Sequence, residues 1–219
     1  MTTEQQRKAR GEAFGYVCHR CMNCCHDKII QVNPYEIAHL ARRLGETTGA
    51  FSETRTHGGE GTSLARTDDG ACVFLGAEGC TVHPDRPLVC RIYPLGRHVE
   101  ADGTERWSHA TPHPRTAGVY SKQGTIADFI ANQDADLFIK AADEYAAWLR
   151  RACEVLDEAT EADELAVELS DADLLDMDGA IAAHCEASGV SEPANLEARK
   201  ALHLAILGQS LDDFAGGDR

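Results

Sequence analysis

Apolar residues recur at helical spacing in one short segment of the N-terminal half, namely Ile37, Leu40, Ala41 and Leu44. Residues three and four apart share one face of a helix, so this pattern predicts a helix with one buried side. Asn33 can cap its start, Pro34 suits the first helical position, and Glu36 can complete a capping box. Gly45 can end it. We therefore expect a helix between residues 34 and 44.

The longest apolar stripe lies in the C-terminal half. Thr125 can cap its start, with Asp128 three residues on, and a break is expected near 132–134. The stripe consists of Ile126, Phe129, Ile130, Leu137, Ala141, Tyr145, Trp148, Leu149, Ala152 and Leu156. Two further helices fit residues 171–186 and 193–207. This half therefore predicts a helical layer.

The N-terminal half shows only short pieces with strand character. Residues 72–75 and 80–82 are two such pieces around Gly76 and Gly79. A hairpin is expected over residues 96–107, turning at Asp102-Gly103, and an ordered loop after it. The fold class that follows is α+β and mostly helical: an irregular, cysteine-rich, metal-binding N-terminal part with short strands and a hairpin, then a C-terminal helical layer.

Charge divides the 219-residue chain into two unlike halves. Residues 1–120 hold 14 Lys and Arg against 14 Asp and Glu, whereas residues 121–219 hold 7 against 22, which accounts for the whole net charge of −15. We expect a flexible N-terminus over 1–13, a metal-binding domain over 14–120, and an acidic helical region over 121–219 packed on it. The acidic half argues against nucleic-acid binding, which needs a basic surface. It is typical of a solvated face, and a protein partner for it is a further hypothesis.

The chain contains no run of about 18 apolar residues, so no membrane span is expected. The first ten residues are polar and are followed by no apolar core of a secretory signal. We therefore expect a cytoplasmic protein. Thiols stay reduced in the cytoplasm, and clustered cysteines then indicate a metal rather than disulfides.

Seven of the nine cysteines fall between residues 18 and 90: Cys18, Cys21, Cys24, Cys25, Cys72, Cys80 and Cys90. The first three repeat the C-x2-C-x2-C spacing that opens a bacterial ferredoxin motif, which favours a [4Fe–4S] cluster. Seven cysteines exceed one tetrahedral site and fall one short of two, so a histidine can complete the count. The candidates are His83, His109 and His113. Such a mixture of ligands also suits zinc, and both metals remain open.

The remaining two cysteines and two of the histidines are expected to have structural roles rather than to bind a metal. Cys153 and Cys185 lie on apolar helical faces and are expected to be small core residues. His184 and His203 are expected at the surface or at helix caps. The same interpretation, a small buried hydrophobe, is hard to apply to four cysteines within eight residues.

The cysteines stand in blocks that resemble the YkgJ-type cysteine-cluster family, described as a zinc- or iron-chelating domain. The blocks are Cys18-x2-Cys21-x2-Cys24-Cys25, Cys72-Val-Phe-Leu, Gly79-Cys80-Thr-Val-His and Arg86-Pro87-x2-Cys90-Arg91-x-Tyr93-Pro94. The resemblance covers about residues 14–120. Family members often carry a further cysteine after the hairpin, and here His109 or His113 occupies that neighbourhood. The flagellin lysine methylase is similar in its cysteine clusters and is regarded as an iron–sulfur protein.

Arg86 and Arg91 flank the last cysteine of the set. Their charges can neutralise a cluster of thiolates, so we expect them beside the cofactor; the alternative is a surface ion pair with the acidic helical layer. Three functions stay open: a redox or structural iron–sulfur or zinc protein, a zinc-only structural or regulatory protein, and a metal-dependent enzyme related to the flagellin methylase. The sequence contains no recognisable nucleophile–base pair for the third.

Overall fold

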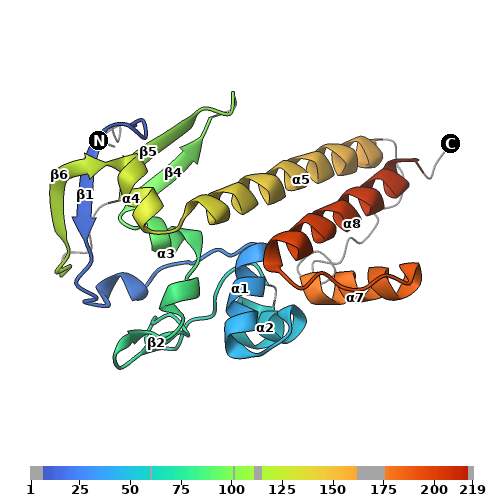
Figure 1. Cartoon of the computed structure of the whole chain (residues 1–219), viewed down its shortest axis with the longest axis horizontal. Helices are drawn as coiled ribbons and strands as arrows, with labels where there is room; N and C mark the ends of the chain where they lie inside the picture. Colours follow the sequence, from blue (N-terminus) through green and yellow to red (C-terminus); the bar gives the residue numbers. More distant parts are fainter. Residues whose placement is uncertain (1–6, 60, 101, 111–114, 162–175, 217–219) are drawn as a thin grey trace. The chain divides into compact units, whose positions relative to one another are not determined.

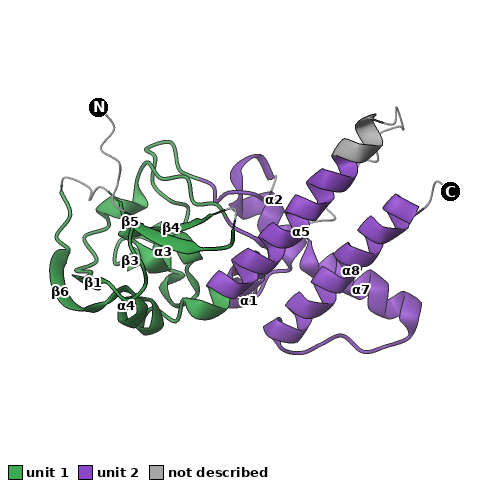
Figure 2. Cartoon of the chain, turned by 90° about the horizontal axis from the view of Figure 1, so that it is seen from above, with its two compact units in different colours: residues 1–31, 66–138 green, residues 32–65, 139–219 purple. Residues whose placement is uncertain are grey.

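The computed structural model describes residues 7–59, 61–100, 102–110, 115–161 and 176–216. The described chain forms two compact units, each built from two separate stretches of sequence (Figure 2). Unit 1 comprises residues 1–31 and 66–138, and unit 2 comprises residues 32–65 and 139–219. The expected boundary near residue 120 coincides with neither unit, because residues 32–65 make their contacts among the C-terminal helices. Among the described helices, none is long and apolar enough to cross a membrane.

Unit 1 contains three antiparallel sheets of two strands each among its described residues. Strand β4 (Leu95–Val99) pairs with β5 (Glu105–His109), which confirms the expected hairpin, with Gly103 in the left-handed region at φ 81°. The short strands β2 (Leu75–Gly76) and β3 (Gly79–Cys80) pair around the two expected glycines. Short helical turns connect these pieces: η1 (Asn23–Cys25), η3 (His83–Asp85) and α3 (Leu88–Ile92).

The third sheet was not expected from the sequence. Strand β1 (Ala13–Val17) pairs with β6 (Val119–Thr125), and the two lie side by side in Figure 1. Strand β6 has almost no buried residue, so it lacks the alternation of apolar and polar positions that marks a half-buried strand. It leads directly into helix α4 (Ile126–Asn132), where Thr125 and Asp128 form the expected capping box.

Residues 7–13 are held rather than flexible, which corrects part of the expected 1–13 tail; residues 1–6 lie outside the described part. The Lys8 backbone exchanges two hydrogen bonds with Trp107, at 2.7 and 2.8 Å. The Arg10 guanidinium donates to the Glu105 carboxylate, from Nε at 2.5 Å. These contacts extend the β4–β5 hairpin by one more backbone segment, over the fully buried Trp107.

Unit 2 is helical. Helix α1 (Pro34–Leu44) has the expected capping box between Asn33 and Glu36, and Gly45 ends it at φ 73°. Helix α2 (Thr48–Arg55) and a short turn η2 (His57–Gly59) follow. The C-terminal stretch supplies α5 (Asp136–Glu161), α7 (Met177–Ser188) and α8 (Leu196–Gly216), shown in Figure 1. The expected break falls at residues 133–135, between α4 and α5. The helix expected from residue 193 begins three residues later, and part of the one expected at 171–186 lies outside the described residues.

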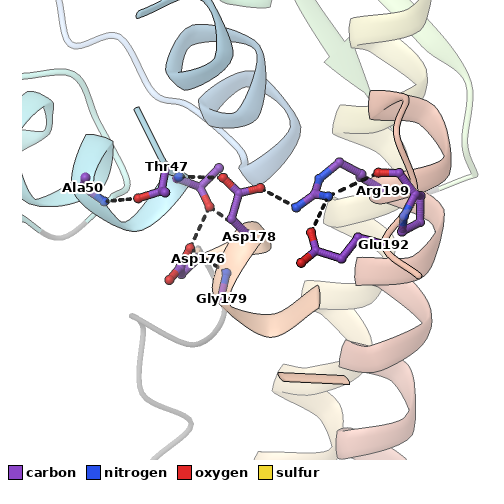
Figure 3. A network of polar contacts seen from close by, with 9 residues as sticks. Thr47, Ala50, Asp176, Asp178, Gly179, Glu192 and Arg199 are labelled. Atoms are coloured by element: carbon purple, nitrogen blue, oxygen red, sulfur yellow. Dashed lines mark hydrogen bonds and ion pairs between the residues drawn. The ribbon is translucent and has the colours of Figure 1, made fainter. Parts of the chain in front are cut away.

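A polar network explains why residues 32–65 belong with the C-terminal helices (Figure 3). The Thr48 backbone donates to Asp178 at 2.9 Å, and the Asp178 backbone donates to the Thr48 hydroxyl at 2.8 Å. The Thr48 hydroxyl also donates to Asp176, which caps α7 through Gly179. Arg199 of α8 pairs with Asp178 at 2.6 Å. The starts of α2 and α7 thus satisfy each other's exposed backbone N–H groups.

Candidate metal centre

The cysteine-rich run follows strand β1 in unit 1. Arg20 and Met22 both have positive φ, at 50° and 62°, and they turn the chain twice within a few residues. The Cys25 backbone then donates to the carbonyl of Met22 at 2.9 Å and closes the turn η1. Cys18 is exposed and the other cysteines of the run are half-buried.

Backbone pairing brings the second cysteine segment to the first. The Cys72 backbone donates to the carbonyl of Cys25 at 2.9 Å, and the Asp27 backbone donates to that of Gly70, also at 2.9 Å. Cys80 lies on β3, opposite Leu75 of β2. Cys90 lies within α3, directly after the β2–β3 region and η3. The backbone thus joins Cys72 to the cysteine run, and Cys80 and Cys90 follow Cys72 closely in the chain of unit 1.

The electrostatics link five of these cysteines. The pKa of the Cys25 thiol is raised by its hydrogen bond with Cys24, by burial, and then by the nearby charges of Cys90 and Cys80. The pKa of the Cys72 thiol is raised by burial and to a smaller extent by Cys80. Thiolates so close together repel one another, which a bound cation relieves.

The pKa values of the adjacent thiols of Cys24 and Cys25 are shifted in opposite directions. The hydrogen bond from Cys25 stabilises the Cys24 thiolate and lowers the pKa of Cys24 to about 6, against the effect of burial. The pair therefore holds one proton, on Cys25, at neutral pH. Cys24 offers a ready thiolate, and Cys25 must lose a proton before it can bind a metal.

Cys21 faces a part of unit 1 that the sequence did not single out. Its sulfur accepts a hydrogen bond from the Ala117 backbone at 3.4 Å and lies 3.9 Å from the Thr116 hydroxyl. The Asn23 side chain donates to the Arg115 carbonyl at 2.9 Å. Hydrogen bonds from the backbone of Ala117 and then of Asn23 lower the pKa of Cys21 to about 7. Backbone N–H groups directed at sulfur also surround the thiolates of many iron–sulfur sites.

The three candidate histidines fall in different places. His83, in η3, lies with its Nδ1 3.4 Å from an Arg86 nitrogen, and burial followed by Arg86 and Arg20 lowers its pKa. It is therefore neutral at pH 7, the form that binds metals. His109 packs edge-on against Phe14 at the end of β5, and burial lowers its pKa too. His113 lies outside the described residues.

The two arginines differ in their surroundings. Arg91 is only 5% exposed, and its guanidinium donates to the carbonyls of Pro84, Arg86 and Gln133 and stacks 3.9 Å above the ring of Phe138. Arg86 is half-buried, and Cys90, Cys80 and Cys18 are the nearby charges that most favour its protonated form. The charges of Cys90, Cys80 and Cys18 thus favour protonated Arg86, against the effect of burial.

Two cysteines and two histidines were expected to be core or surface residues rather than ligands, and two of these four lie where they were expected. Cys185 is buried, and His184 is exposed, as expected. Cys153 is exposed on α5, so its assignment to the core was wrong. His203 is fully buried, and its Nδ1 lies 2.9 Å from the Tyr145 hydroxyl, so its assignment to the surface was also wrong.

The donors fit a soft metal ion, although their side chains are not yet gathered around one point. Within the described residues, no three Cys, His, Asp or Glu side chains form a ready metal-binding group. The cysteines nevertheless share one electrostatic neighbourhood, and sulfur is the ligand that zinc and iron–sulfur clusters prefer.

Sequence reasoning missed Asn23, Thr116 and Ala117 as partners of the cysteine run. Residues 115–118 lie more than 90 positions from the run, and they carry no motif of their own. The unpredicted pairing of β1 with β6 brings them there, because it places Val17 opposite Val119. Without that strand pair, the sequence offers no signal for the contact.

Comparison with families of known proteins supports this assignment. Residues 17–112 match the family model CxxCxxCC, described as a "Putative zinc- or iron-chelating domain". The matched segment contains all seven clustered cysteines, together with His83, His109 and both arginines. Searches among curated proteins and among solved structures gave no match. Residues 17–112 are therefore similar to the CxxCxxCC family of zinc- or iron-chelating domains.

Proposed function

We propose that the thiolates of Cys25, Cys72, Cys80 and Cys90 hold a [4Fe–4S] cluster. The observation that carries the proposal is the electrostatic contact of Cys25 with Cys80 and Cys90, together with the backbone bond from Cys72 to Cys25. Four thiolates from separate segments make a complete ligand set for such a cluster. When bound, the cluster supplies one-electron transfer, and its ligation also fixes the irregular part of unit 1.

Cys18, Cys21 and Cys24 form a second set in this proposal. Three thiolates leave one position for another ligand, and we assign it to His83, whose ring contacts Arg86 and whose pKa is lowered by burial. A Cys3His group is an ordinary zinc site. His109 and His113 remain predictions for the same position.

A zinc-only protein is the second candidate. The lowered pKa of His83 favours it, because neutral imidazole nitrogen is a common zinc ligand. In that case both sets hold zinc, the metal cross-links the chain without redox chemistry, and four thiolates form a closed structural site.

Metal and sulfide analysis of protein purified without oxygen tests the proposal. We expect about four irons and four acid-labile sulfides per chain, with a broad absorption near 400 nm. Cys80→Ser and Cys90→Ser should each lose most of the iron. Cys153→Ser is the matched control, since Cys153 is exposed on α5 in unit 2, and it should keep the full iron content.

Three outcomes separate the candidates. Colourless protein with one or two zinc ions and no sulfide refutes the cluster and supports the zinc-only protein. Iron content that survives both Cys80→Ser and Cys90→Ser refutes the assigned ligand set. Loss of zinc alone in Cys21→Ser, with iron retained, supports the division into two sets.

A further inference from the structure

Arg86 connects the cysteines to the corner between α4 and α5. Its Nη1 donates to the His83 carbonyl at 2.7 Å, and its Nη2 donates to the Gln133 side chain at 2.6 Å. Both acceptors are neutral. Among the described residues, no carboxylate forms an ion pair with Arg86, although Asp134 contributes a weaker attraction.

The negative charges that most favour protonated Arg86 are those that the cysteines carry when they are ionised. Burial opposes its protonated form, and the charges that favour that form are, in order, those of Cys90, Cys80 and Cys18, with Asp134 last. Metal binding needs deprotonated thiols, so loading increases this negative charge. Four thiolates around one divalent zinc leave a net charge of −2, because four charges of −1 are added to +2. Loading therefore strengthens the attraction that holds the Arg86 guanidinium.

Gln133 stands at the end of α4, where the chain changes direction before α5. It caps α4, and Asp134 follows with a positive φ of 50°. Arg91 donates to the carbonyl of Gln133 at 3.0 Å, so both arginines beside Cys90 hold this one residue. The corner has a few local hydrogen bonds of its own, including Ala135 to Ile130 at 3.3 Å. Its order thus depends in part on the arginines.

We propose that metal loading of the cysteines is transmitted through Arg86 and Gln133 to the α4–α5 corner, which becomes more ordered in the loaded protein. The inference rests on the proposed function, since it requires that the cysteines bind a metal. It makes Arg86 a positioning residue, which acts on the corner through Gln133. Helix α5 begins directly after this corner, at Asp136.

Amide hydrogen exchange, with and without metal, tests the coupling. Reduced, chelator-stripped protein is compared with the same protein after addition of Zn²⁺, which thiolates bind without an oxidant. We expect exchange in peptides covering residues 131–137 to slow by about fivefold or more on loading, the low end of ordinary coupling between two sites. In Arg86→Gln and in Gln133→Ala, the same peptides should change by less than about twofold.

Two further variants make the test specific. Lys122→Gln also removes one positive charge from unit 1, but Lys122 is exposed on β6, so the full effect should persist. Arg86→Lys keeps the charge and should recover part of the effect. Zinc content is measured on every sample, so that a loss of coupling is separated from a loss of binding.

The exchange rates and the zinc content together decide whether the coupling exists. Slower exchange in the wild type that disappears in Gln133→Ala at unchanged zinc content supports it. A loaded protein whose corner exchanges at the stripped rate overturns it, as does an equal effect in wild type and both Arg86→Gln and Gln133→Ala. A protein that takes up no zinc or iron refutes the proposed function itself, and the coupling with it, through the metal analysis rather than the exchange rates.

Discussion

Replacing Glu105 by Gln should loosen the part of unit 1 that leads into the cysteine run. The Glu105 carboxylate accepts hydrogen bonds from Arg10, from Arg97 at 2.6 Å and from the Trp107 ring nitrogen at 2.8 Å. Arg10 belongs to the segment directly before β1, so this carboxylate ties the N-terminal segment to the hairpin. A neutral amide in place of the carboxylate would leave two guanidinium groups without their shared anion.

The magnitude follows from the pKa of Glu105. Burial opposes its ionised form, but the hydrogen bonds from Arg10, Arg97 and Trp107 outweigh it and lower the pKa from 4.5 to about 2. A shift of about 2.5 units corresponds to about 3.4 kcal/mol. The side chain is 18% exposed, and solvent screens its ion pairs, so we expect a loss of about 2 kcal/mol in Glu105→Gln.

The sign of the pH dependence distinguishes this reasoning from a general packing defect. A carboxylate with a lowered folded-state pKa contributes fully above its unfolded pKa of about 4.5, and its contribution disappears as the pH falls through about 2. At pH 3 about four-tenths of it remains. The difference in unfolding free energy between wild type and Glu105→Gln should therefore shrink below about 1 kcal/mol at pH 3.

Urea denaturation followed by Trp107 fluorescence measures this difference. Both proteins carry Trp148→Phe, and chelator and reductant are present throughout, so that metal binding does not contribute. Glu100→Gln is the control on the same hairpin; its partner Arg7 is half exposed, so a loss below about 0.5 kcal/mol is expected. The reasoning fails if Glu105→Gln costs no more than the control, or if its cost is the same at pH 7 and pH 3.

Three other substitutions test separate parts of the fold. Asn33→Ala removes the capping box of α1 and should lower the unfolding free energy by about 1 kcal/mol, measured by thermal unfolding; an unchanged midpoint would contradict the cap. Burial lowers the pKa of His203 from 6.5 to about 4, so its contribution to stability is complete above pH 6.5, should be lost as the pH falls from about 6.5 to about 4, and should change little below that. His203→Gln should remove that part of the acid sensitivity, and identical acid titrations would refute it. Arg91→Met removes three hydrogen bonds to carbonyls and should lower the unfolding free energy of the metal-free protein by about 3 kcal/mol or more. A loss below about 1 kcal/mol would show that packing on Phe138 is enough to hold this region.

Local signals predicted the elements that local chemistry determines. Asn33, Glu36 and Gly45 fix both ends of α1, and Thr125 with Asp128 fixes the start of α4. The β4–β5 hairpin was predicted for the same reason, since its turn residues and its strands are adjacent in sequence. Helix α2, strand β1 and strand β6 were missed, because they are short and their partners lie far away along the chain.

The two units show what the sequence could not reveal. Charge changes sharply near residue 120, yet residues 32–65 belong with the acidic helices. The contacts responsible are Thr48 with Asp176 and Asp178, about 130 residues apart. A threonine at the start of α2 and two aspartates at the start of α7 are ordinary capping residues. Nothing in either segment indicates that the two helix starts contact each other.

The candidate site was predicted at the level of ligand type but not of geometry. Clustering identified the seven cysteines, because no packing role accounts for four thiols in eight residues. The surroundings depend on tertiary contacts: Ala117 reaches Cys21 only through the β1–β6 pair, and Gln133 reaches Arg86 only because the chain turns after α4. Arg91 was expected beside the cofactor, which stays a prediction, and its contacts with three backbone carbonyls were not foreseen.

The distribution of protons among the cysteines gives the site an order of assembly. At pH 7, Cys24 with a pKa of about 6 is ionised and Cys21 with a pKa of about 7 is half ionised. The pKa of Cys25 and that of Cys72 are raised, so both keep their protons in the metal-free protein. Each proton that a metal ion displaces opposes its binding. Under the proposed function, we therefore expect the ionised thiols of Cys21 and Cys24 to bind a metal ion more readily than the protonated thiols of Cys25 and Cys72.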